Sequence, residues 1–439
     1  MIRPFSIGLV LVLVSCAPAF AQPPLTLREA IARARAQNPD AGSTAAAERE
    51  ASQRLTQARA AFMPKVDLTE SWQRGNQPVF VFSSLLSQRR FTSGDFALPS
   101  LNRPSAMDNF RTAVVAEQPI LDSTARSGVS AARLAHDVSV AHRSLVAQDL
   151  ASNVTAAYGS VLAAAAARES ASAAVEAARA DRERAGNRRD AGLVTDADVL
   201  QLDVYLARAR EQEIQSAAEE RTARAQLNLL MAEPLDVRFG LDRATTAVAI
   251  DTGNISALEA EALEHRPAVK IAALEERLGT AGVDAAKAAF LPQVSAQGGW
   301  EFNGGTWATR SSSWVVGAVA RFNLFRGFAD KARLAEAREL LSRRSQERRK
   351  AEAAARFDVY AAVARLEAAR ASETVGRAAE AQARESRRII RDRYDGGLTD
   401  VASLLRATES VVQAEAQQTA AEIGVLIATA ALERALGRQ

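Results

Sequence analysis

Few side chains in this sequence are arranged for acid–base, nucleophilic or metal chemistry. The 439 residues include three histidines and one cysteine, Cys16. His136 and His142 are six residues apart, which places them on different faces of a helix, and His265 is isolated. The sequence has no Walker loop, Gly-x-Gly-x-x-Gly or Gly-x-Ser-x-Gly motif. It therefore predicts no enzyme, and neither a cofactor nor a metal site.

The charged residues are numerous but balanced. The chain has 55 basic and 52 acidic residues, and a net charge of +3 predicts no strong attraction to nucleic acid. Carboxylates interleave with arginines at helical spacing, which is typical of solvated helix faces. The basic cluster within 343–350 is interpreted in the same way, with contact to peptidoglycan or to a partner protein as the alternative.

The apolar residues are mostly small. They make up 48% of the chain, but only 5% of residues are aromatic and 95 are alanine. This composition is that of a folded protein. Small side chains favour closely packed helices over a thick core of leucine and phenylalanine.

The N-terminus is predicted to be a signal peptide that covers residues 1–21. Arg3 precedes an apolar stretch at 5–14, and Ala19-Phe20-Ala21 has the small-x-small form of a cleavage site. The alternative is a lipobox that ends at Cys16, which would then carry a lipid. Both alternatives take the protein out of the cytoplasm. No later stretch is expected to match the ~18 apolar residues of a spanning helix, so any membrane crossing is assigned to β-strands.

Proline positions indicate where long helices can form. The chain has no proline between Pro119 and Pro234 and none after Pro292. Because proline disrupts helix interiors, the tracts 124–190 and 328–394 are predicted to be helices of about 100 Å each. The alternative is a series of shorter helices broken at glycines such as Gly159 or Gly376.

The sequence repeats itself. Ala60-Ala61-Phe62-Met63-Pro64-Lys65-Val66 matches Ala288-Ala289-Phe290-Leu291-Pro292-Gln293-Val294. Gly192-Leu193-Val194-Thr195-Asp196 resembles Gly397-Leu398-Thr399-Asp400, with one residue missing in the second copy. These matches indicate a tandem duplication of about 200 residues. Each copy is predicted to contain a helix, a β-hairpin, a very long helix, a tight turn and a final helix.

Between the Phe-x-Pro element and the long helix, the hydrophobic period changes from helix to strand. In the second copy, apolar residues alternate with polar ones from Val294 to Phe302 and again from Trp314 to Leu324. This is the pattern of an outer-membrane barrel strand, although a soluble half-buried hairpin looks similar. The first copy alternates less cleanly at 65–74 and 111–119, because Glu70 and Glu117 interrupt it.

In their order and duplication, these features resemble the TolC family of outer-membrane efflux channels. The resemblance covers nearly all of residues 25–437. It rests on the Phe-x-Pro junctions and the tip turns. It also rests on the strand-to-helix junctions Gln118-Pro119-Ile120-Leu121-Asp122 and Asn323-Leu324-Phe325-Arg326-Gly327.

The resemblance implies a fold and a function. The expected fold is mainly α with a membrane β-barrel: a trimeric 12-stranded barrel, four strands per chain, continued by a long α-helical barrel. Four strands cannot close a barrel alone, but three chains supply twelve. The implied function is a passive exit duct of a tripartite efflux or type I secretion system. A periplasmic adaptor would join it to an inner-membrane transporter. The implied location is the outer membrane of a Gram-negative bacterium, with the helical barrel in the periplasm.

The runner-up function is a soluble periplasmic coiled-coil scaffold or adaptor. Adaptors carry a β-rich domain around one helical hairpin, whereas this chain has two hairpins and no such domain.

The predicted organisation follows the repeat. The signal peptide is 1–21, the first repeat 22–232, an equatorial linker 233–256 and the second repeat 257–439. The first repeat divides into a β-hairpin at 65–120 with an extracellular loop at 75–110, a long helix at 121–191, a tip turn at 192–196 and a helix at 197–232. The second divides into a β-hairpin at 293–325, a long helix at 326–395, a tip turn at 396–400 and a helix at 401–437.

The functional residues are expected at the two tip turns. Apolar residues at an exposed tip need an explanation. The resemblance implies that they dock a periplasmic adaptor, and packing against one another is the alternative. The docking residues are Gly192, Leu193, Val194, Gly396, Gly397 and Leu398. The resemblance also implies a gate that holds the periplasmic mouth closed. Asp196 matches a family aspartate and Tyr394 its tyrosine partner, and Asp400 is the second-copy counterpart. The family arginine falls at the missing residue, so Arg391 or Arg393 is the candidate.

Overall fold

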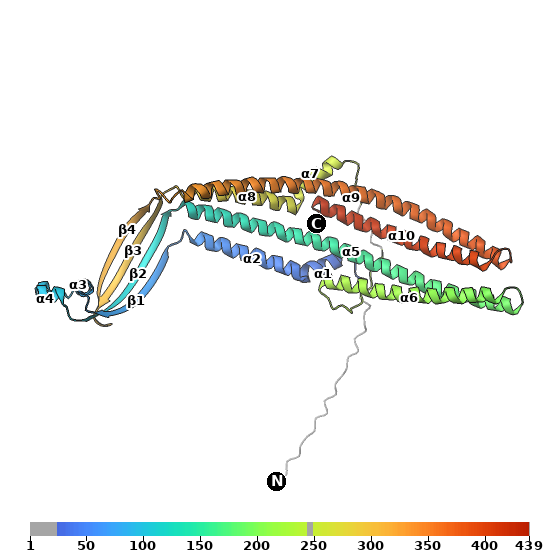
Figure 1. Cartoon of the computed structure of the whole chain (residues 1–439), viewed down its shortest axis with the longest axis horizontal. Helices are drawn as coiled ribbons and strands as arrows, with labels where there is room; N and C mark the ends of the chain where they lie inside the picture. Colours follow the sequence, from blue (N-terminus) through green and yellow to red (C-terminus); the bar gives the residue numbers. More distant parts are fainter. Residues whose placement is uncertain (1–23, 244–248, 439) are drawn as a thin grey trace, which may run out of the picture. The chain divides into compact units, whose positions relative to one another are not determined.

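The computed structural model describes residues 24–243 and 249–438. The expected signal peptide and Cys16 lie outside these ranges. Figure 1 shows long helices and one β-sheet. The helices are α1 (Leu27–Gln37), α2 (Pro39–Ala60), α3 (Pro78–Ser87), α4 (Leu98–Asn102), α5 (Ser123–Asp190), α6 (Asp196–Met231), α7 (Ile255–His265), α8 (Pro267–Ala288), α9 (Ala329–Asp395) and α10 (Val401–Leu436). The strands are β1 (Lys65–Gly75), β2 (Met107–Leu121), β3 (Gln293–Gly304) and β4 (Ser311–Arg321).

The chain forms two compact units that do not follow the sequence repeats. The first unit contains the described residues of Met1–Ala34, Asn153–Val248 and Ser372–Ile427. The second contains Arg35–Ser152, Ala249–Ala371 and the described residues of Ala428–Gln439. Each unit therefore contains a part of the first repeat and the equivalent part of the second, because α5 and α9 contribute to both units.

The two long helices are continuous. α5 has 68 residues and α9 has 67, so the alternative of shorter helices broken at Gly159 or Gly376 is wrong. Both glycines lie where α10 approaches closely. A Cβ at Gly159 would lie 2.9 Å from Ile423 Cγ2, and one at Gly376 would lie 3.4 Å from Gln418 Cα. These glycines therefore permit helix contact and do not end a helix.

Part of α5 is more apolar than the sequence analysis expected. An 18-residue window in this helix has a mean hydropathy of 1.3, which is apolar enough to cross a membrane, and 39% of the window is buried. The expectation that no stretch after the N-terminus has this property was therefore wrong. Alanines of α5, including Ala163 and Ala167, line a groove with α6 and α10. Small residues that permit helix packing also raise the hydropathy.

The sheet has the order β1-β2-β3-β4, with every neighbouring pair antiparallel. Its strands align aromatic residues in register: Trp72 faces Phe110, and Trp300 faces Trp314. The same face carries Val316, whose exposed fraction is 72%, like that of Trp314. An exposed apolar face edged by aromatic residues is typical of strands that face lipid.

Glu70 interrupts this apolar face, but it has partners there. The Thr112 hydroxyl donates a hydrogen bond to it, and Arg310 Nη2 lies 3.6 Å from its carboxylate. β2 begins at Met107, not near Arg111, so the connection between β1 and β2 is shorter than the predicted 75–110 loop. It is also more ordered, because it contains α3, α4 and a 3₁₀ helix at Ser93–Phe96.

Two glycines in α5 offer a test of the close helix approach. Gly159→Ala would force a methyl group against Ile423, so we expect a net loss of about 1–2 kcal/mol in unfolding free energy, since overpacking outweighs helix propensity. Gly128→Ala is the matched control, because no atom lies within 4 Å of its Cβ position. It should gain up to about 1 kcal/mol. Denaturant unfolding followed by circular dichroism measures both, and shifts of the same sign would contradict this account.

Candidate functional site

The two turns between the long hairpin helices have the same backbone geometry. Both lie at one end of the first unit, where α5 joins α6 and α9 joins α10 (Figure 1). Gly192 has φ +76° and Gly397 has φ +71°. The next residue in each turn, Leu193 or Leu398, donates its backbone N–H to a carbonyl five residues back, at 2.8 Å in both turns. This is the Schellman motif, in which glycine takes the left-handed position without strain.

The helices that leave the turns are capped by side chains. Thr195 and Asp198 form a capping box at the start of α6. Asp400 accepts a hydrogen bond from the backbone N–H of Ser403 at 2.9 Å, before α10. Hydrogen bonds from Ser403 hold the pKa of Asp400 below its usual value. Each turn therefore combines a helix stop and a helix start within a few residues.

A single apolar cluster joins the two hairpins behind the turns. Its buried members are Ala185, Val199, Leu202, Tyr394, Val401 and Leu404. They come from α5, α6, α9 and α10, so this cluster belongs to both repeats. The apolar residues of the turns themselves lie outside it. Leu193 is 68% exposed and Leu398 is 71% exposed, while Val194 is half-buried.

Tyr394 packs against an arginine that the sequence analysis did not identify. The guanidinium of Arg188 lies over the Tyr394 ring, 5.0 Å from its centroid. Its Nη1 donates a hydrogen bond to the Tyr394 carbonyl at 3.0 Å and lies 4.0 Å from Asp395. Arg188 precedes Gly192 by the same distance as Arg393 precedes Gly397. The repeat alignment was therefore the signal that could have identified it.

The Tyr394 hydroxyl is buried and has no hydrogen-bond partner within the described residues. Burial raises the pKa of Tyr394, and the charge of Arg188 opposes that rise. The phenol is therefore protonated at neutral pH. Within one chain, Tyr394 therefore contacts Arg188 through its aromatic ring and its backbone carbonyl, and not through its hydroxyl.

The second link between the hairpins is an ion pair. Asp181 of α5 is 7% exposed, and Arg391 Nη2 of α9 lies 3.4 Å from its Oδ1. Arg184 contacts the same carboxylate. The sequence analysis named Arg391 as a candidate partner for Asp196, and the structure places it beside Asp181.

The predicted gate residues are thus only partly brought together in one chain. The side chain of Asp196 is 84% exposed, and its nearest cation is Arg189 Nη1 at 3.7 Å, within the same hairpin. Arg189 also contacts Asp190. Arg393 is exposed.

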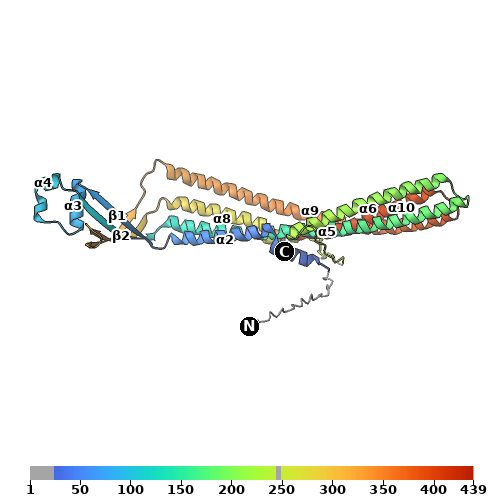
Figure 2. The same cartoon turned by 90° about the horizontal axis from the view of Figure 1, so that it is seen from below.

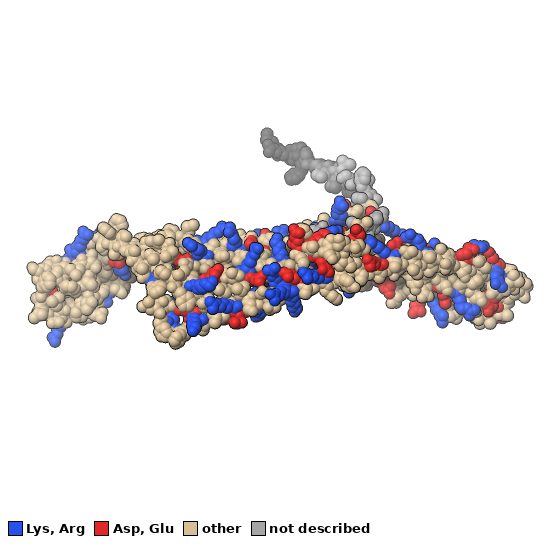
Figure 3. Space-filling view, turned by 90° about the horizontal axis from the view of Figure 1, so that it is seen from above, with Lys and Arg blue, Asp and Glu red and all other residues tan. Residues whose placement is uncertain are grey.

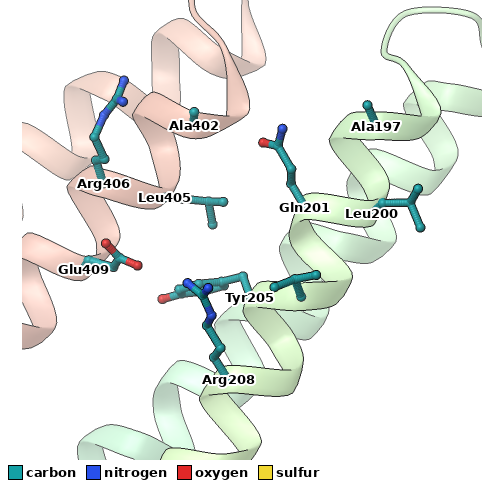
Figure 4. Close-up of a pocket in the computed structure, with 10 residues that line it drawn as sticks. Ala197, Leu200, Gln201, Tyr205, Arg208, Ala402, Leu405, Arg406 and Glu409 are labelled. Atoms are coloured by element: carbon teal, nitrogen blue, oxygen red, sulfur yellow. The ribbon is translucent and has the colours of Figure 1, made fainter.

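A groove runs between α6 and α10 near the turns (Figure 4). Its volume is about 530 Å³. Tyr205 and Arg208 reach it from α6, and Leu405, Arg406 and Glu409 reach it from α10 (Figure 4). The groove therefore offers apolar surface next to charges of both signs. Figure 3 shows acidic and basic side chains interspersed over the helices, and few over the sheet.

Comparison with known proteins identifies the family. The family model for outer membrane efflux proteins matches residues 30–233 and 258–438. Protein CyaE of Bordetella pertussis is 31% identical over 302 residues, which is 66% of this chain and 62% of that protein.

Solved structures with the same fold include three bacterial membrane proteins. The Campylobacter jejuni CmeC outer membrane channel has a TM-score of 0.81 at 17% identity, covering 94% of this chain and 85% of that one. A membrane protein from Pseudomonas aeruginosa gives 0.80 at 21% identity, with 94% and 90% covered. The outer membrane protein VceC of Vibrio cholerae gives 0.78 at 18% identity, with 94% and 96% covered.

These similarities confirm the fold class and the outer-membrane location predicted from the sequence. The family match covers both repeats and leaves out part of the connection between them. The chain belongs to the outer membrane efflux protein family.

Proposed function

We propose that three copies of this chain form a passive exit duct through the outer membrane. The observation that carries the proposal is the open four-stranded sheet with an exposed apolar face. Its outer strands β1 and β4 each have one paired neighbour in the chain. Unpaired strand edges are not tolerated in lipid, and twelve strands from three chains close a barrel that four cannot.

The hairpin tips support a connection to other parts of an export system. Both tips present a leucine that is about two-thirds exposed, on a turn held by a Schellman motif. We assign Gly192, Leu193, Val194, Gly396, Gly397 and Leu398 to docking of a periplasmic adaptor. The adaptor would join the duct to an inner-membrane transporter, in a tripartite efflux or type I secretion system. The groove between α6 and α10 provides adjoining apolar surface.

The contacts between hairpins support a closed periplasmic mouth. Arg188 with Tyr394, and Asp181 with Arg391, each link the first hairpin to the second. We propose that these links hold the mouth closed within each chain. Asp196, Arg393 and Asp400 remain proposed gate residues, and the exposed carboxylate of Asp196 is accessible to a neighbouring copy.

A passive duct needs no catalytic group, and we assign the chain no enzymatic activity. Within the described residues, no three His, Cys, Asp or Glu side chains are grouped to hold a metal ion. The competing function is a periplasmic coiled-coil scaffold or adaptor.

Two measurements on the full chain distinguish these functions. The duct should resist carbonate extraction from membranes and form ion-conducting pores in planar lipid bilayers. A scaffold should be extracted by carbonate and should give no conductance. Heat-modifiable mobility on a gel tests for the trimer.

Substitutions on the two sheet faces should affect assembly unequally. Val316→Arg or Ala318→Arg adds a charge to the apolar face. We expect the stability of the barrel in the membrane to fall by about 2–4 kcal/mol if the site lies near the bilayer midplane. Gln297→Arg is the matched control, because Gln297 lies beside Val316's partner Gly298 but on the opposite face. The readout is the urea dependence of the heat-modifiable trimer in lipid vesicles. Equal losses at both faces would show that the apolar face does not contact lipid.

A further inference from the structure

The connection between β1 and β2 folds back onto the sheet. One face of its helix α3 is buried: Val81 is 7% exposed, Ser84 3% and Gln88, just after the helix, 4%. These three residues follow helical spacing and form one stripe. The sequence analysis expected an exposed loop here, so this burial is an unexpected contact.

Hydrogen bonds identify the part of the sheet beneath α3. Gln88 Nε2 donates to Asn109 Oδ1 at 3.0 Å, and Asn109 Nδ2 donates to Asn303 Oδ1 at 3.0 Å. Asn109 is 8% exposed and Asn303 is 2% exposed. The Ser311 hydroxyl donates to the Gln88 carbonyl at 2.9 Å. The connection is therefore fixed to β2, β3 and the start of β4.

The alternation of side chains along each strand shows which face α3 covers. Asn109 precedes Phe110 and Asn303 follows Phe302, and both phenylalanines belong to the apolar face. Neighbouring residues of a strand point to opposite faces. Asn109 and Asn303 therefore lie on the polar face, which is the lumen face of the proposed barrel. Helix α3 lies at the strand ends remote from the long helices of its unit (Figure 2). In the proposed barrel it therefore folds inward over the lumen.

The opposite side of α3 is exposed and carries two large apolar residues beside Ser83 and Ser87. Val79 is 77% exposed and Leu86 is 50% exposed. They are seven residues apart, or two helical turns, and at about 100° per residue they lie opposite the buried stripe. With the buried stripe against the barrel wall, Val79 and Leu86 point into the lumen.

The size of the barrel brings the three copies of α3 into reach of one another. Twelve strands about 4.8 Å apart and tilted by about 40° enclose a backbone diameter of about 24 Å. Each α3 is about 10 Å wide with its side chains. Three such helices around one axis require a circle of about 22 Å. Because inward-facing strand side chains make the free opening narrower than the backbone diameter, three helices that fold inward over it fill it and come into contact.

We propose that Val79 and Leu86 from three copies of the chain meet at the threefold axis and form an apolar constriction at the outer end of the duct. The exposed Val79–Leu86 side of each α3 therefore packs against α3 of the neighbouring protomers. Apolar constrictions restrict ion flow by excluding water. The inference rests on the proposed trimeric duct and adds a second barrier, at the outer opening of the barrel.

Conductance in planar bilayers tests the constriction. In the Arg188→Ala background, where the periplasmic mouth should not limit the current, Val79→Ser with Leu86→Ser should raise the single-channel conductance at least twofold, because water can then fill the outer opening. Leu98→Ser is the control, since Leu98 is 72% exposed in the same connection but lies outside α3. An unchanged conductance in the double variant, or an equal rise in Leu98→Ser, would overturn the proposal. Absence of conductance in both the wild type and the Arg188→Ala variant would instead count against the duct itself.

Cysteine cross-linking tests the contact directly in the assembled protein. Leu86→Cys should form a disulfide between two chains under mild oxidation and give a cross-linked dimer on a denaturing gel. Ser84→Cys is the matched control on the buried side of α3 and should stay monomeric, as should the unmodified chain. Cross-linking at Ser84→Cys, or none at Leu86→Cys in a protein that conducts, would show that the helices do not meet through this stripe.

Discussion

Charged substitutions at the hairpin tips should abolish export while leaving trimer formation intact. Leu193→Asp and Leu398→Asp replace side chains that are 68% and 71% exposed, so the fold of the chain loses little. In a docked complex, each leucine would contribute about 1.5–3 kcal/mol by burial, and an aspartate there would lose this and add the cost of a desolvated charge. A trimer presents each tip three times, so the loss of binding free energy to the adaptor occurs at three copies of each tip.

Complementation of a strain that lacks this protein measures the effect, with export of that strain's own substrate as the readout and heat-modifiable mobility as the assembly control. Leu193→Met and Leu398→Met are the matched variants, because methionine keeps an apolar side chain of similar volume. They should export normally. Full export by both aspartate variants would show that the tips are not the docking surface.

The long helices could be predicted from the sequence because their signal is repeated over many residues. The absence of proline from two tracts and the duplication of the turns Gly-Leu-Val-Thr-Asp and Gly-Leu-Thr-Asp located α5, α9 and both tip turns to within a few residues. The strands of the second repeat were predicted nearly as well, because their alternation is regular. The first hairpin was less clear, since Glu70 interrupts an apolar face and is compensated there by Arg310 from another strand connection.

The remaining features depend on contacts between segments far apart in the chain. Gly159 does not break α5, because its missing side chain makes room for Ile423 of α10. The inward fold of α3 depends on Gln88 meeting Asn109. The pairing of Asp181 with Arg391 depends on how α5 and α9 are aligned along their lengths. None of these contacts follows from local propensity or from the spacing of residues within one helix.

Loss of the contacts between the hairpins should open the periplasmic mouth. The ring of Tyr394 and its carbonyl both bind Arg188. A cation–π contact contributes about 0.5–2 kcal/mol and a hydrogen bond from a charged group about 1.5–3 kcal/mol. Asp181 and Arg391 form a second link whose carboxylate is nearly buried. Together the links are expected to stabilise the closed mouth by about 3–5 kcal/mol per chain. The three chains must open together.

We therefore expect Arg188→Ala and Asp181→Asn each to raise the open probability in planar bilayers at least tenfold, and the double variant to raise it further. Tyr394→Phe should change little, because the Tyr394 hydroxyl has no hydrogen-bond partner within the described residues of one chain. Tyr394→Ala, by contrast, should open the mouth because it removes the ring from the apolar cluster.

Two controls separate this gate from a general effect of charge. Arg179 is an exposed arginine of α5 that pairs with Glu176 of the same helix, so Arg179→Ala should leave the open probability unchanged. Asp196→Ala should have a smaller effect than Asp181→Asn, because Asp196 is highly exposed and its ion pair with Arg189 is worth less than about 1 kcal/mol. If Asp196→Ala or Tyr394→Phe opens the channel more than Arg188→Ala does, the gate is held by contacts between neighbouring chains and not by the links within each chain.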